Sequence, residues 1–359
     1  MQKEVIMHIG IEASALCSKQ PTGIGRYTEK IIKFLLKEKS DYDQLSLHIP
    51  LFPLKNLKYR RPYTQYYLKK PRSKYIDVFH GTDHRLPYNY ALKNMMTIHD
   101  LFIFHENAQG MAPQNYREKK WKIFENVIPR LDGVITVGQQ SKKDIMHYFN
   151  ISEKKISVVP HGVDEEFDIV DSQERIRVLK KYKLPEKFIF FVGSISERKN
   201  TERMVEAFIK SSVYQKVHFV MIGNISHMGE KTVDLIKQKD IRKKILLLPF
   251  IEDQDLVAIY NAAKALFFVT LYEGFGIPIL EAFSTKTPVL ASKTGESPYV
   301  AQSFAALANP YDIDEISDKL EEVLDWPTEK IELAYSYARQ CTWQRTAQMT
   351  YQAYQKVLS

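Results

Sequence analysis

The sequence predicts an α/β protein built from two doubly wound parallel sheets, each in a domain of its own. Three observations support this fold class. Short, nearly continuous apolar strands alternate with stretches of helical period along the chain. The polar stretch 161–187 separates two such series. A chain of 359 residues is also long enough to form two cores of ordinary size.

The expected strands are short apolar runs bounded by polar or turn-forming residues. They lie at 5–11, 45–49, 75–80, 95–99, 133–137 and 156–160 in the first half, and at 188–193, 217–223, 244–250, 265–269 and 288–291 in the second. Stretches of helical period, such as 26–38 and 201–212, stand between them. We expect one domain over 1–165 and a second over 166–340. Ligands of such sheets bind beyond the carboxyl ends of the strands, so two crevices could face each other.

The composition is that of a globular protein, with 44% hydrophobic and 26% charged residues. No run of 18 apolar residues occurs, and the first residues alternate like a strand rather than forming a signal peptide. The only two cysteines, Cys17 and Cys341, are far apart, which argues against a disulfide scaffold. We therefore expect a cytoplasmic protein.

The net charge of +8 is unevenly distributed. Residues 1–164 carry 26 Lys and Arg against 16 Asp and Glu, whereas residues 165–359 carry 25 against 27. Within the first half, the stretch 51–75 has eight basic residues, no acidic residue and five tyrosines. It is either a solvated face or a surface for an anionic partner, such as membrane lipid, a lipid-linked phosphate or nucleic acid.

The stretch "LYEGFGIPILEAF" (271–283) places two glutamates among glycines and apolar residues. Pro278 suits the first residue of a helix, and no Ser, Thr, Asp or Asn in 274–277 can cap that helix. Its N–H groups are therefore available to an anion, which the glycines allow to approach closely. Glu273 in the loop and Glu281 in the first turn would accept hydrogen bonds from sugar hydroxyls on either side. A ligand that has a diphosphate in the middle and a sugar at each end is a sugar nucleotide, so we expect a ligand of that class.

A second element agrees with this interpretation. In "FVGSISERKN" (191–200) a strand and a glycine turn precede Arg198 and Lys199, and Asn200 is the expected cap of the next helix. Two adjacent cations at the carboxyl end of a strand suit a diphosphate. The alternative is an ordinary exposed basic pair.

Glycines and histidines in the first half are further candidates. The loop "SKQPTGIGRY" (18–27) has Thr28 where a dinucleotide fingerprint needs its third glycine, so Gly23 and Gly25 are better explained as a loop that closes over a ligand. His80 and His99 both end strands, which places them at the crevice. Hydrogen bonding to substrate is the favoured role, because the spacing of these histidines matches no standard zinc pattern.

A metal site is not expected. The pattern Asp-x-Asp can bind a metal ion that carries a diphosphate, and it occurs at 41–43, 253–255 and 312–314. None of the three follows a predicted strand in the surroundings that such a metal site needs.

Together, "EGFGIPILEA", "FVGSISERKN", "VVPHGVD", "TIHDL" and "TGIGRY" resemble glycosyltransferase family 4, retaining sugar-nucleotide transferases of the GT-B fold. The resemblance spans nearly the whole chain in the right order. It implies two Rossmann-like domains facing across a cleft, no catalytic metal or other cofactor, and a C-terminal helix over 341–359 that crosses back to the first domain. One departure is Tyr299, which stands where many relatives have a glutamate after the proline.

Carried over by residue, the resemblance implies that Arg198 and Lys199 hold the diphosphate, that Glu273 and His99 contact the transferred sugar, and that Glu281 binds the ribose. The backbone of Phe275, Gly276 and Ile277 would bind sugar and phosphates. The implied catalytic set is Arg198, Lys199, Glu273 and His99. The implied donor-binding set is Gly193, Ser194, Phe275, Gly276, Ile277 and Glu281. The implied acceptor-side set is Gly23, Gly25, Tyr27, His80 and Asp100.

These expectations describe a retaining, metal-independent glycosyltransferase that builds a surface polysaccharide, such as lipopolysaccharide, or a lipid-linked glycan. GDP-mannose is the donor we expect, and the acceptor would be a glycan or a lipid-linked saccharide. The basic stretch 51–75 would hold the enzyme peripherally on the inner face of the cell membrane.

Two other classes remain as alternatives. A sugar-nucleotide epimerase of similar fold would release nucleotide without an acceptor. A basic nucleic-acid-binding protein would need a continuous basic face, which the slightly acidic second half disfavours. We expect no nucleic-acid partner. A dehydrogenase is disfavoured by the incomplete glycine fingerprint.

Overall fold

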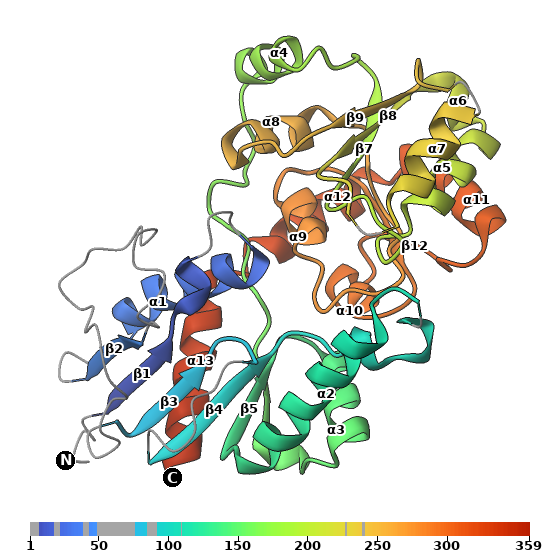
Figure 1. Cartoon of the computed structure of the whole chain (residues 1–359). Coiled ribbons are helices and arrows are strands. Elements are labelled where there is room, and N and C mark those ends of the chain that lie inside the picture. The colour runs from blue at the N-terminus through green and yellow to red at the C-terminus, as the bar shows by residue number, and fades with distance from the viewer. Residues whose placement is uncertain are drawn as a thin grey trace. The chain divides into compact units, whose positions relative to one another are not determined.

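The computed structural model describes residues 7–17, 22–38, 43–48, 76–84, 92–108, 110–226, 228–238 and 241–359. The chain divides into two compact units (Figure 1). Unit 1 comprises Met1–Phe104, Pro113–Gly162 and Trp343–Ser359, and unit 2 comprises His105–Ala112 and Val163–Thr342. The chain thus leaves unit 1 after Gly162 and returns at Trp343, near the boundaries expected from the sequence.

Unit 1 contains a parallel sheet of six described strands in the order β2-β1-β3-β4-β5-β6. The strands are β1 (His8–Glu12), β2 (Gln44–His48), β3 (Val78–Gly81), β4 (Lys93–Ile98), β5 (Gly133–Thr136) and β6 (Ile156–Val158). All four residues of β3 and of β5 are buried. This burial explains why these strands read as continuous apolar runs rather than alternating ones.

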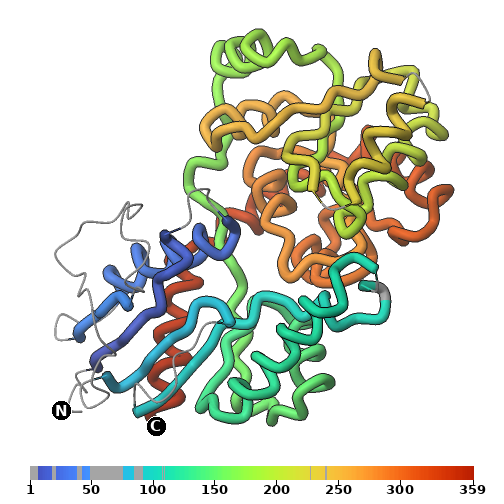
Figure 2. The backbone as a smooth tube through the Cα atoms, viewed as in Figure 1, coloured from blue at the N-terminus to red at the C-terminus, as the bar shows by residue number. Residues whose placement is uncertain are grey.

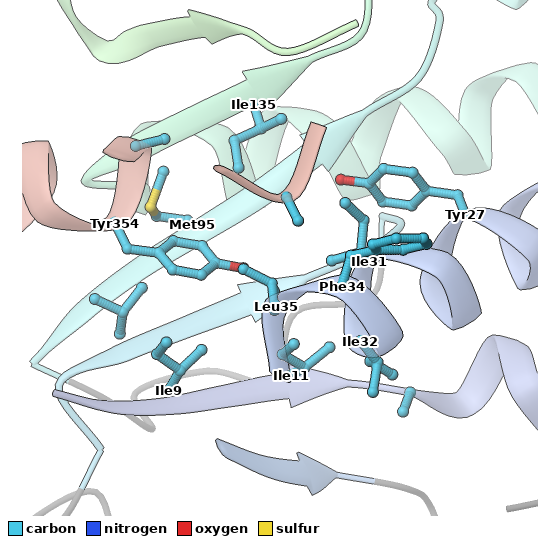
Figure 3. Packing of buried hydrophobic residues seen from close by; sticks show 14 of the residues in the cluster. Ile9, Ile11, Tyr27, Ile31, Ile32, Phe34, Leu35, Met95, Ile135 and Tyr354 are labelled. Atoms are coloured by element: carbon cyan, nitrogen blue, oxygen red, sulfur yellow. The ribbon is translucent and has the colours of Figure 1, made fainter. Parts of the chain in front are cut away.

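The helices of unit 1 are α1 (Gly23–Glu38), α2 (Gln114–Val127), α3 (Gln139–Phe149) and α13 (Trp343–Leu358). Short 3₁₀ turns lie at Ser14–Cys17, Phe102–Phe104, Ile128–Arg130 and Glu153–Lys155. In α13 the buried residues recur every three or four positions, from Trp343 through Ala347 and Thr350 to Tyr354. This stripe packs with α1 and β1 in one core cluster (Figure 3). Figure 2 traces the C-terminal helix, in red, back to the blue and cyan segments of unit 1.

Unit 2 contains a second parallel sheet of six described strands, in the order β12-β11-β10-β7-β8-β9. These are β7 (Phe188–Val192), β8 (His218–Ile222), β9 (Ile245–Leu248), β10 (Leu266–Phe268), β11 (Val289–Ser292) and β12 (Ala306–Ala308). The chain order reverses direction between β7 and β10, which is the point where doubly wound sheets bind ligands.

The helices of unit 2 connect these strands. They are α4 (Ser172–Lys181), α5 (Thr201–Lys210), α6 (Val213–Lys216), α7 (Glu230–Gln238), α8 (Asp253–Ala262), α9 (Ile277–Ser284), α10 (Ser297–Ala301), α11 (Ile313–Leu324) and α12 (Thr328–Ala338). A 3₁₀ turn, Glu106–Ala108, also belongs to this unit although its sequence neighbours lie in unit 1.

The predicted fold class is confirmed, since both sheets are parallel and strands alternate with helices over much of the described chain. Each of the eleven expected strands corresponds to an observed one, and β12 was not predicted. None of the described helices is both long and apolar enough to cross a membrane. The basic stretch 51–75 lies outside the described residues.

Candidate functional site

The loop after β7 carries the two cations that the sequence analysis singled out. Gly193 ends the strand with φ +143°, a conformation that L side chains rarely adopt. Gly223, at the end of β8, has φ +144°, and a Cβ there would lie 2.0 Å from the Gly193 carbonyl oxygen. Gly193 is therefore favoured by its backbone conformation, and Gly223 is required both by its conformation and by the backbone of Gly193 beside it. Ser194 follows, and its hydroxyl lies 3.3 Å from that of Ser196.

Arg198, Lys199 and Glu273 form one charged group, which we call the donor cluster. Lys199 Nζ donates to Glu273 Oε1 at 2.6 Å, and Arg198 Nη1 lies 3.7 Å from Glu273 Oε2. Arg198 Nη1 also donates to the Tyr272 carbonyl oxygen at 3.2 Å. The exposed fraction of the side chain is 36% for Arg198, 13% for Lys199 and 9% for Glu273. Arg198 is therefore the most accessible charge of the cluster.

The charge of Glu273 is maintained despite its burial. Burial by itself raises the pKa of the carboxyl group, but the nearby positive charges of Lys199 and Arg198 outweigh it and the net pKa is lowered. Glu273 is therefore ionised at neutral pH. The cluster carries one negative and two positive charges, which leaves a net positive site for an anion.

Helix α9 begins beside Glu273 without a side-chain cap, as predicted. Its N-cap is Gly276, whose φ of +99° suits glycine, and Pro278 lies in the first turn. Phe275 and Ile277 flank this glycine. The positive end of the helix dipole and its first N–H groups thus lie at the same loop as Glu273, an arrangement that favours an anion.

Glu281 lies one turn further along than expected. It is the fifth residue of α9 and therefore belongs to the second turn. Its Oε2 accepts a hydrogen bond from the Tyr260 hydroxyl of α8 at 2.6 Å. Tyr260 is fully buried and packs edge-on against Phe190. The carboxylate is therefore held by a rigid ring, and the sequence offered no local signal for a partner 21 residues away.

Two further residues support the donor cluster in ways that the sequence did not show. Asn200 is the N-cap residue of α5, but its side chain does not cap the helix as expected. Its amide instead donates to the carbonyls of Val269 and Pro310, at 3.0 and 2.7 Å, and so ties the loop after β7 to the end of β10. Gly295 has φ +65°, and a Cβ there would meet the Glu273 backbone at 3.1 Å. Only the glycine in "TGES" hinted at this close approach.

In unit 1, His99 and Asp100 follow β4 and are partly exposed, as a crevice position requires. His99 Nε2 donates to the Thr82 carbonyl oxygen at 3.0 Å. Burial lowers the pKa of His99, which keeps the ring neutral at pH 7. The Asp100 carboxylate accepts from the Phe102 N–H at 3.1 Å. His99 is thus oriented by a backbone group.

Two of the expected acceptor-side residues are buried instead. His80 has an exposed fraction of 0%, and its two ring nitrogens bond to the Tyr354 and Thr97 hydroxyls, both at 2.7 Å. Burial lowers the pKa of His80 to about 3. Tyr27 is also buried, and its hydroxyl lies 2.9 Å from that of Thr97. The prediction that His80 and Tyr27 face a ligand is therefore wrong, because a strand end or a first helical turn can equally point into the core.

The two glycines of "TGIGRY" also differ from expectation. Gly23 and Gly25 form the first turn of α1 rather than a loop. Gly23 is exposed, with open space where a Cβ would lie, whereas Gly25 is buried and a Cβ there would meet the Ala15 carbonyl oxygen at 3.2 Å. Gly25 therefore allows α1 to pack closely on the turn after β1.

One described aspartate in each of the three Asp-x-Asp patterns has structural partners. Asp43 accepts from the Met7 N–H and the Tyr351 hydroxyl, Asp255 accepts from three side chains, and Asp312 caps α11. Within the described residues, no three His, Cys, Asp or Glu side chains are grouped as a metal would need.

The expected donor-binding residues all belong to unit 2 and gather on the loops after β7 and β10 and on α9. The expected acceptor-side residues and His99 belong to unit 1. The donor cluster can bind a diphosphate through two fixed cations and a helix terminus, and its carboxylate can accept hydrogen bonds from sugar hydroxyls.

Known proteins resemble this chain over most of its length. Serotype-specific mannosyltransferase WbdA of Escherichia coli is 28% identical over 75% of this chain, which corresponds to 34% of WbdA. O-antigen chain mannosyltransferase B of the same organism is 25% identical over 93% of this chain and 96% of its own. The crystal structure of a glycosyltransferase from Rickettsia africae matches with a TM-score of 0.74 at 17% identity, covering 99% of both chains, which supports the GT-B fold.

Two family models match consecutive parts of the chain. The model described as Glycosyltransferase Family 4 matches residues 23–167, and the model described as Glycosyl transferases group 1 matches residues 172–340. The two models together cover most of unit 1 and nearly all of unit 2, so the resemblance holds in both halves of the chain. The chain belongs to glycosyltransferase family 4.

Proposed function

We propose that this protein transfers mannose from GDP-mannose to a glycan or lipid-linked acceptor in the biosynthesis of a surface polysaccharide, with retention of anomeric configuration and without a metal ion. The observation that carries the proposal is the donor cluster beside the N-terminus of α9. Two relatives named as mannosyltransferases support the choice of sugar.

The donor cluster suits the leaving group of this reaction. When the bond between the sugar C1 and the diphosphate oxygen breaks, the electron pair stays on that oxygen and the negative charge on the diphosphate grows. Arg198, Lys199 and the first N–H groups of α9 stabilise this charge by fixed positive charge and dipoles. Glu273 keeps Lys199 in place through their 2.6 Å bond and accepts hydrogen bonds from the sugar.

The acceptor hydroxyl attacks C1 from the face that the diphosphate leaves. The new bond forms between the acceptor oxygen and C1, and the acceptor proton passes to the departing phosphate oxygen. The sugar thereby keeps its anomeric configuration. His99, with its Nε2–H donated to Thr82, presents Nδ1 as a hydrogen-bond acceptor to a hydroxyl of the donor sugar.

A donor panel tests the proposal. The purified protein is incubated with UDP-, GDP- and dTDP-sugars, with and without mannan oligosaccharides or lipid-linked acceptors, and nucleotide release is measured. We expect release from GDP-mannose that rises when acceptor is added. Conversion of the donor into another sugar nucleotide without acceptor would instead identify an epimerase.

Two further measurements on the same reaction test the finer claims. Proton NMR of the first product should show the anomeric configuration of the donor, and an inverted product would contradict retention. Transfer should continue in EDTA. Loss of activity in the chelator, with recovery on addition of Mn²⁺ or Mg²⁺, would contradict metal independence.

A further inference from the structure

Four aromatic rings of unit 1, one of them His99, form a cluster. We call Tyr27, His99, His161 and Trp343 the ring cluster. Tyr27 meets His99 edge-on with ring centroids 4.7 Å apart, and His161 stacks on His99 at 5.7 Å with an angle of 28° between the ring planes. His161 also lies 5.4 Å from Trp343, and Tyr27 lies 5.1 Å from His161. His161 therefore contacts both His99 and Trp343, and Tyr27, whose ring centroid lies 6.4 Å from that of Trp343, contacts the same two rings from another side.

The ring cluster leaves His99 few orientations. Its Nε2–H bonds to the Thr82 carbonyl oxygen, and its own backbone carbonyl accepts from the Ser141 hydroxyl at 3.1 Å. The Tyr27 edge and the His161 face then close two sides of the imidazole. Burial lowers the pKa of both His99 and His161, so both rings are neutral at pH 7 and stack without charge repulsion.

The ring cluster also lies where the chain passes between the two units. His161 is one residue before the chain leaves unit 1 after Gly162, and Trp343 is the residue at which it returns. The next residues, Val163 and Thr342, form a parallel bridge, with the Val163 N–H donating to the Cys341 carbonyl oxygen at 2.9 Å. These two connections, at 162–163 and 342–343, therefore run side by side. On the unit 1 side, Trp343 directly follows one of them, and His161 lies one residue before Gly162 at the other.

We propose that His161 and Trp343 are positioning residues that hold the His99 imidazole in its working orientation and link that orientation to two of the connections between the units, those at 162–163 and 342–343. The proposal rests on the proposed function in one respect, the contact of His99 with the donor sugar. It assigns no chemical step to His161 or Trp343. The flat ring of His161, rather than its nitrogens, carries the effect.

The test compares His161→Ala with His161→Phe, which keeps a flat ring and removes the nitrogens. Trp343→Phe keeps an aromatic face and removes an indole N–H that has no hydrogen-bond acceptor among the described residues. Trp121→Phe is the matched control, because Trp121 packs against Phe104 and Phe149 in a different aromatic group of unit 1. Each full-length variant is examined for thermal unfolding, kcat, KM for GDP-mannose and affinity for GDP.

A spectroscopic measurement separates the proposal from the proposed function. In protein labelled at histidine, the His99 ring resonances, identified by their loss in His99→Gln, report stacking and tautomer directly. We expect His161→Ala to shift and broaden these resonances, and His161→Phe and Trp121→Phe to leave them close to the wild type. Unmoved His99 resonances in His161→Ala would overturn the positioning claim, whatever the activity.

The kinetic outcome is equally specific. We expect His161→Ala to lower kcat about ten-fold with GDP affinity unchanged, since small misplacements of a group near the reacting bond cost rate. His161→Phe should recover most of that loss. Equal losses in both variants would overturn the role of the ring. If His99→Gln is as active as the wild type, the role of His99 in the proposed function fails, and the resonances still decide whether His161 positions it.

Discussion

At the scale of single residues, Arg198 is the cation of the donor cluster best placed to meet a ligand. Its side chain is 36% exposed, against 13% for Lys199. We expect Arg198→Ala to remove about 2–4 kcal/mol of transition-state stabilisation, which is a loss of roughly thirty- to a thousand-fold in kcat. Thermal unfolding should stay within about 2 °C of the wild type, because the closer partner of Glu273, Lys199 at 2.6 Å, remains in this variant. Normal turnover in this variant would refute the diphosphate assignment.

Lys199 differs from Arg198 because it neutralises a buried carboxylate. Lys199→Ala leaves Glu273 with only Arg198 at 3.7 Å, so we expect both lost activity and a loss of about 3 kcal/mol in the free energy of unfolding of unit 2. The double variant Lys199→Met with Glu273→Gln should recover much of that stability but not the activity. Lys199→Ala with the stability of the wild type would contradict the buried pair.

The same pair predicts a pH dependence. The folded pKa of Glu273 is lower than its unfolded value, so its contribution to stability is present above the unfolded pKa and is lost as pH falls through the folded one. The stability difference between wild type and Lys199→Ala should therefore be constant near pH 7 and shrink below about pH 4. Denaturant titrations at pH 7, 5, 4 and 3 measure it, and a difference that grows toward pH 3 would be inconsistent with this assignment.

At the scale of elements, Asp255 fastens α4 to α8. Its carboxylate accepts from Arg177 at 2.7 Å, Lys181 at 2.5 Å and Tyr182 at 2.7 Å. Burial alone would raise the pKa of Asp255, but these three donors lower it to about 2. The two helices are thus joined by the buried Asp255 carboxylate and the three side chains that donate to it.

We expect Asp255→Asn to destabilise unit 2 by about 1–2 kcal/mol at pH 7. This figure already allows for solvent screening, because Arg177 and Lys181 are half-exposed. Because the folded pKa is lowered, the effect should fade between about pH 4 and pH 2. Hydrogen exchange of α4 amides would measure it. Glu332→Gln, which removes an exposed pair with Lys286, is the control and should change stability by less than about 0.5 kcal/mol. Equal protection of α4 in both variants would disprove the anchor.

Sequence patterns predicted where the strands lie better than they predicted which way individual side chains point. Continuous apolar runs located eleven strands, because parallel strands bury both faces. The strand β12 lies in the apolar run FAALA (304–308), which is rich in alanine and has no β-branched residue, so it carries little strand preference. His80 and His99 both follow the strand-end rule, yet one points into the core and the other is partly exposed, since a pattern along the chain does not report which side is covered. The Tyr260–Glu281 bond and the grouping of His105–Ala112 with unit 2 depend on contacts distant in sequence.

At the scale of the whole molecule, the first half carries the positive charge, and the stretch 51–75 carries eight of its basic residues. Basic residues near an anionic leaflet contribute about 1 kcal/mol each, so we expect the protein to co-sediment with anionic vesicles at low salt and to be released at high salt. Replacing Lys55, Lys58, Arg60, Arg61, Lys69, Lys70, Arg72 and Lys74 by Ser should weaken binding and leave donor hydrolysis intact.

Serine substitution of eight lysines in the slightly acidic second half is the control for that experiment. It should leave vesicle binding near the wild-type level if the stretch 51–75 is responsible. A wild-type protein that ignores anionic vesicles would show that the membrane assignment is wrong, and a soluble saccharide would then be the better candidate for the acceptor.

The central claim is that unit 2 holds the diphosphate of a sugar nucleotide between Arg198, Lys199 and the start of α9. Calorimetric titration of GDP and GMP into wild type and Arg198→Ala tests it most directly, because the two ligands differ by one phosphate. We predict that the wild type binds GDP at least about ten-fold more tightly than GMP and that Arg198→Ala loses most of this difference. Equal affinity of the wild type for GDP and GMP, or an undiminished preference for GDP in Arg198→Ala, would contradict the account.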